Sequence, residues 1–178
     1  DFSGLRASLL WQPADNLAVT LMHVRQELTQ DGVTGVDPDI GGYKNVGLEI
    51  TNGAEGRVDE RQFTNLVIEA DVDWGSFIST TTTTDGSLVR DIDSTRALNF
   101  PSAFLDDIET EGFVQELRFS SDFSGPFQLL SGIYYEDIES FLHELVEWSG
   151  DDASNFFGGG NLLGTINSHN DIQQLAFF

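Results

Sequence analysis

The chain has 178 residues, of which 30 are acidic and 8 are basic, so its formal net charge is −22. This charge argues against nucleic-acid binding, because no basic face is available to neutralise phosphates. Hydrophobic residues make up 39% of the chain, which is too many for a disordered acidic tail. The absence of cysteine excludes disulfides, zinc–thiolate sites and cysteine nucleophiles.

The first half of the chain alternates apolar and polar residues with the period of a β-strand. Residues 5–12 and 17–22 alternate on either side of a tight turn at 13–16, which predicts a hairpin. Residues 65–74 alternate again. After a turn at 75–76, the threonine-rich residues 77–84 favour a returning strand.

The second half repeats this pattern. Residues 113–120 alternate, residues 122–126 form a turn by composition, and residues 127–136 return. A seventh strand is expected from Ile172 to Phe178. We therefore predict an all-β fold, an antiparallel up-and-down meander of about seven strands.

Long polar segments separate the hairpins, at 28–60, 86–112 and 139–171, and they hold 19 of the 30 acidic residues. Within the last segment, Phe141, Leu142, Leu145 and Trp148 have helical spacing, which predicts a short helix over 140–148.

The alternation of short turns with long loops is typical of outer-membrane β-barrels, which have short periplasmic turns and long extracellular loops. The predicted strands have about 9–12 residues, the length that a tilted membrane strand needs. The sequence thus favours a curved, open segment of a transmembrane β-barrel. Four aromatic residues next to the short turns are predicted to lie at the membrane interface: Trp11, Trp74, Phe123 and Phe127.

Charged residues within one strand agree with a barrel. Glu69, Asp71 and Asp73 share a strand face opposite Leu66 and Ile68. Such a face suits a water-filled lumen, and it suits the solvated face of a soluble sheet equally well.

Two segments resemble TonB-dependent outer-membrane receptors. Residues 115–121 (QELRFSS), a short turn and residues 125–135 (GPFQLLSGIYY) are similar to a hairpin of these barrels, and residues 5–13 (LRASLLWQP) with 17–21 resemble an earlier hairpin. The resemblance implies a barrel of about 22 strands in the bacterial outer membrane, with an N-terminal plug. It also implies import of a scarce ligand, such as an iron–siderophore complex, with energy supplied through TonB.

The chain departs from this family pattern, because it contains no plug and only about seven strands. We therefore expect residues 1–178 to be an internal part of the barrel domain, which would contact TonB only through a plug that is not present. Expected partners are outer-membrane lipid and the transported ligand.

Candidate ligand contacts come from aromatic residues of the long segments: Tyr43, Trp148, Phe156 and Phe157. Packing between loops would explain any one of them as well. His23, His143 and His169 are scattered, and no nucleophile or phosphate-binding motif occurs, so we predict neither enzymatic activity nor a metal or cofactor.

Two other functions remain open on the sequence. A complete small barrel of eight strands would serve as an adhesin or anchor, and its length suits the chain. A soluble acidic β-sandwich would bind calcium or carbohydrate through its Asp-rich loops. For the open barrel segment we predict a band of exposed apolar side chains: Leu9, Leu21, Leu66, Ile68 and Val72.

Overall fold

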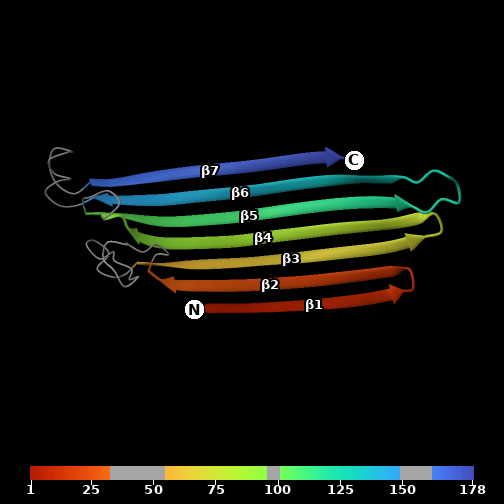
Figure 1. The fold of residues 1–178 in the computed structure, drawn as a ribbon, viewed down its shortest axis with the longest axis horizontal. Helices are drawn as coiled ribbons and strands as arrows, with labels where there is room; N and C mark the ends of the chain where they lie inside the picture. Colours follow the sequence, from red (N-terminus) through yellow and green to blue (C-terminus); the bar gives the residue numbers. More distant parts are fainter. Residues whose placement is uncertain (33–54, 96–100, 149–161) are drawn as a thin grey trace.

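The computed structural model describes residues 1–32, 55–95, 101–148 and 162–178. These residues form one antiparallel sheet whose seven strands follow each other in chain order (Figure 1). The strands are β1 (Phe2–Ala14), β2 (Leu17–Asp31), β3 (Gly56–Val72), β4 (Gly75–Asp93), β5 (Ser102–Ser121), β6 (Leu130–Trp148) and β7 (Leu162–Phe177). The predicted all-β up-and-down meander is confirmed, and the sheet is open, with β1 and β7 at its edges.

Three connections lie at one end of the sheet, which we call the turn side (Figure 1, right). Residues 15–16 join β1 to β2, residues 73–74 join β3 to β4, and residues 122–129 join β5 to β6. In the last connection, Nε2 of Gln128 donates to the carbonyl of Phe123 over 2.9 Å, and the hydroxyl of Ser121 donates to Oε1 of Gln128 over 3.0 Å. The opposite end is called the loop side.

The strands are longer than the sequence predicted. They have 13 to 20 residues, and much of the three polar segments belongs to β3, β4, β5, β6 and β7. The seventh strand begins at Leu162 and not at Ile172, and the sixth begins at Leu130 and not at Phe127.

The predicted helix over 140–148 is wrong, because these residues are the loop-side part of β6. Each of them pairs with β5 on one side and with β7 on the other. Leu142 and Val146 lie on one face of the sheet, and Phe141 and Leu145 lie on the other. Two ladders of backbone hydrogen bonds thus override a spacing that also fits a helix.

The register defines two faces. Face A carries Leu9, Leu21 and Leu66, and face B carries Arg6 and Val67. Positions along the strands are given from one reference row on face A, which crosses all seven strands through direct cross-strand partners: Leu9, Leu21, Leu66, Thr81, Gln115, Tyr135 and Leu175.

Among the described residues, no helix combines the length and hydropathy needed to cross a membrane.

Candidate functional site

The turn-side half of face A is an exposed apolar surface. This surface consists of the reference row and the three rows of face A nearer the turns. Among the described residues, these four rows contain no charged side chain. Leu9 is 64% exposed and Ile68 is 36% exposed. We call this surface the apolar band; its larger members include Leu9, Trp11, Leu21, Leu66, Ile68, Val72, Leu117, Ile133, Leu175 and Phe177. Soluble proteins rarely leave so continuous an apolar surface uncovered.

A cluster of aromatic rings lies at the turn-side end of the apolar band. Trp74, in the turn between β3 and β4, lies 5.6 Å from Phe77 and 5.2 Å from Phe119 between ring centroids, and those two rings are 4.9 Å apart. Phe77 and Phe119 are direct partners across β4 and β5. The three rings form one cluster at the end of face A.

The four aromatic residues predicted for the membrane interface all lie near the turn side. Trp11 is near the end of β1, Trp74 is in a turn, and Phe123 and Phe127 are in the connection between β5 and β6. All four are exposed, and Phe127 is the most open at 82%.

The four predicted ligand contacts are not brought together among the described residues. Trp148 ends β6 at the loop side, and its side chain lies outside the described part of the structure. Tyr43, Phe156 and Phe157 also lie outside the described residues.

Face B bears the charges of the turn-side half. Glu69 and Asp71 of β3 lie on it, as the sequence predicted, and so do Glu116 and Arg118 of β5. Nε of Arg118 donates to Oε1 of Glu116 over 3.1 Å. In this half of the sheet one face is apolar and the other is charged.

Toward the loop side, both faces carry apolar and charged side chains. There face B carries Leu88, Ile108 and Leu142 in one row, with Val146 buried beside them. Face A carries exposed carboxylates, four of which are direct partners on neighbouring strands: Asp85, Glu111, Glu139 and Asp171. Face A also carries apolar side chains in this half: Val58, Val89, Leu105, Phe141 and Leu145.

An ionic triad lies on the loop-side half of face B. Nη2 of Arg57 donates to Oδ2 of Asp59 over 2.5 Å, and Nε of Arg61 donates to Oδ1 over 2.8 Å. Asp59 itself is buried. The hydrogen bond from Arg61, with that from Arg57, lowers the pKa of Asp59 against the opposing effect of desolvation.

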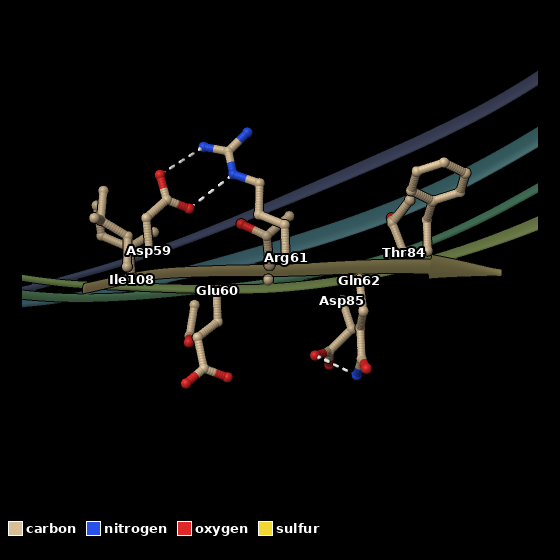
Figure 2. A pocket seen from close by; sticks show the side chains of 12 residues that line it. Asp59, Glu60, Arg61, Gln62, Thr84, Asp85 and Ile108 are labelled. Carbon is tan, nitrogen blue, oxygen red and sulfur yellow. Dashed lines mark hydrogen bonds and ion pairs between the residues drawn. The ribbon is translucent and has the colours of Figure 1, made fainter. Parts of the chain in front are cut away.

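A hollow of about 340 Å³ adjoins the triad, around Gly86. Figure 2 shows Asp59, Arg61 and Ile108 on one side of the strand and Glu60 and Asp85 on the other. The residues around it thus come from both faces of the sheet and include charged and apolar side chains, and they do not select one class of ligand.

A second ionic group occupies the next row of face B toward the loops. Arg90, Asp106 and Glu144 are direct partners on β4, β5 and β6. Nε of Arg90 donates to Oδ2 of Asp106 over 2.6 Å, while the buried Oδ1 of Asp106 has no hydrogen-bond partner among the described residues. Desolvation, a hydrogen bond with Asp106 and the charge of Asp106 raise the pKa of Glu144, and Arg90 opposes them.

Neither ionic group was predicted, because Arg57, Asp59, Arg90 and Asp106 lie in segments expected to be polar loops and Glu144 lies in the expected helix over 140–148. The histidines form no metal site either. In the part of the chain that the structure describes, no three His, Cys, Asp or Glu side chains are placed to hold a metal ion. His143 instead bonds Asn167 over 2.6 Å, and His169 stacks on Phe141 with ring centroids 4.3 Å apart.

Comparison with known proteins adds no relative: no family model, no curated protein and no solved structure matches this chain.

Proposed function

We propose that this chain is part of the wall of a TonB-dependent outer-membrane receptor that imports a scarce ligand such as an iron–siderophore complex. The apolar band faces lipid, and face B of the turn-side half faces the water-filled lumen. Strands beyond β1 and β7 close the barrel, since each of these strands has one unpaired edge in the open sheet.

One observation carries the membrane part of the proposal. The apolar band is uncharged over its four rows, exposed, and bordered by the cluster of Trp74, Phe77 and Phe119 at the turn side. An outward apolar band bordered by aromatic rings is the pattern of an outer-membrane barrel. In water the same band would be an aggregation surface.

The receptor part of the proposal is supported by the hairpin motif. Residues 115–121 form the turn-side end of β5, and residues 130–135 form the start of β6, so the two motif segments are paired across one turn. Arg118 of this hairpin points to the proposed lumen beside Glu116.

Uptake in the host tests the proposal. Deletion of the gene is expected to abolish accumulation of a radiolabelled ferric siderophore on iron-limited medium, and deletion of the host's TonB should have the same effect. The protein should fractionate with the outer membrane. Unchanged uptake of every siderophore offered would contradict import of this class of ligand.

The soluble alternative gives the opposite result in a simple measurement. A β-sandwich would remain monodisperse in buffer without detergent, and its melting temperature would rise with calcium. The isolated barrel segment should instead aggregate in buffer, because its apolar band has no partner in water.

A further inference from the structure

On face A, the distance from the reference row to the first carboxylate toward the loop side varies among the strands. We call the line through these side chains the carboxylate line: Asp1, Glu27, Glu60, Asp85, Glu111, Asp137 and Asp171. Toward the loop side, the offset is eight residues on the β1 strand, six on β2 and β3, four on β4 and β5, two on β6, and four on β7.

We propose that the carboxylate line marks the outer edge of lipid contact on this sheet, and that the strands cross the hydrocarbon at a tilt of about 40°. The partner of face A on the turn side of the line is lipid acyl chains, and beyond the line it is water and lipid headgroups. This inference rests on the proposed function, because it requires that face A meets a membrane.

The cost of charge in hydrocarbon explains why the line is a boundary. A charged residue on the lipid face of a barrel destabilises it most at the middle of the membrane and little near the interface. On β4 and β5, residues 75–84 and 112–121 lie between the turn and the line. Each span has ten residues, the length of a tilted membrane strand.

The slope of the carboxylate line gives the tilt of the strands relative to the membrane. Neighbouring strands lie about 4.8 Å apart and rise about 3.4 Å per residue, so strands tilted by about 35–45° meet a membrane plane at positions that shift by about 1.0–1.4 residues per strand. From Asp1, directly before β1, to Asp137 on β6, the carboxylate line shifts by six residues in five steps, about 1.2 residues per strand; on β7 it turns back by two residues. An edge perpendicular to the strands would give equal offsets.

The basic side chain on the turn side of the line agrees with this boundary. Arg25 lies on β2 at an offset of four, and its Nη2 donates over 3.3 Å to Oε2 of Glu60, which belongs to the line. Its charge is thus directed toward the interface, as long cationic side chains near a membrane edge are.

Labels at equal offsets on distant strands test the inference. Leu5 and Glu139 both lie four residues from the reference row, so an edge perpendicular to the strands would place them at equal depth. The oblique line places Leu5 inside the hydrocarbon and Glu139 outside it. The chain has no cysteine, so Leu5→Cys and Glu139→Cys can each be labelled with bimane in the full receptor after any cysteine elsewhere is replaced by serine.

The labelled receptor is reconstituted in phosphatidylcholine vesicles with brominated acyl chains, and fluorescence is compared with that in unbrominated vesicles. We expect loss of fluorescence for Leu5→Cys and no loss for Glu139→Cys. Ile68→Cys serves as the band control and Val67→Cys as the lumen control; only the first should be quenched.

The controls separate two ways of failing. If Ile68→Cys is quenched and Leu5→Cys and Glu139→Cys respond alike, the oblique line is wrong while the membrane assignment stands. If Ile68→Cys is not quenched, face A does not meet lipid, and both the proposed function and this inference are overturned.

Discussion

Arg61 and Asp59 point to the same side of β3 two residues apart, and Nε of the guanidinium donates to Oδ1 of the carboxylate over 2.8 Å. Arg57 approaches the same carboxylate from the other direction along the strand. One buried acid thus holds two arginines in a fixed order on face B, beyond the part of the sheet assigned to lipid. The pairing has measurable consequences for stability.

Asp59→Asn should lower the free energy of unfolding by about 1–3 kcal/mol, because it leaves two guanidinium groups without their charged partner. Glu60→Gln is the matched control. Glu60 pairs with Arg25 on the opposite face, and both side chains are well exposed, so its loss should cost no more than about 0.5 kcal/mol. Urea unfolding of the receptor in detergent measures both. Equal effects would show that burial of Asp59 adds nothing.

The carboxyl pair of Asp106 and Glu144 should make the stability of the folded state fall as pH rises. A carboxylate in a salt bridge has the opposite effect. The pKa of Glu144 is raised above 4.5 in the folded state. Its contribution to stability is therefore fully present below pH 4.5 and is lost as pH rises through the raised value.

Glu144→Gln should remove this pH dependence while its amide still donates to Asp106. Unfolding in urea at a series of pH values between 4 and 8 checks the prediction, with Glu139→Gln as a control on the exposed face of the same strand. A wild-type stability that rises with pH across this range, and that stops rising in Glu144→Gln, would contradict the raised pKa of Glu144.

Gly75 should be the least replaceable glycine of the described strands. A Cβ there would lie 2.5 Å from the backbone carbonyl oxygen of Ser120 and 2.6 Å from the Phe119 ring, and the backbone cannot give way cheaply. Gly75→Ala should therefore cost about 1–3 kcal/mol and reduce the folded yield. In Gly86→Ala the nearest atom is 3.5 Å away, so that variant should fold normally. Yields of folded receptor in the outer membrane distinguish the two.

A positive charge introduced into the turn-side half of β3 should be tolerated on face B but not in the apolar band of face A. Leu66→Arg places a cation in the middle of the proposed lipid-facing surface and should destabilise the barrel by about 2–4 kcal/mol. Val67→Arg, one residue further on β3, lies on face B, the proposed lumen face, and should cost far less. Resistance of each variant to unfolding by denaturant gives the comparison, and equal tolerance would argue that face A is not covered by lipid.

The sequence predicted the turn-side half of the sheet well and the loop-side half poorly. Around Leu66 and Ile68, alternation is simple, with apolar residues on one face and carboxylates on the other, so strands and turns were found. In β6, Phe141 and Leu142 are apolar neighbours on opposite faces, and this pattern imitates a helix. The ionic pair of Arg90 and Asp106 brings together residues from separate strands, and only the register of β4 with β5 reveals it.

The change of side-chain pattern between the turn-side and loop-side halves also limits how far each strand can slide along its neighbours. A strand with one polarity pattern along its whole length can move by two residues and still present the same kind of side chain to each side. Here a slide of β5 by two residues toward the turns would bring Glu111 to the level of Phe113, between Thr83 and Asp137. A slide the other way would bring Phe113 to the level of Glu111, between Asp85 and Glu139. The side chains of each strand therefore favour one register with its neighbours, independent of the turn that precedes the strand.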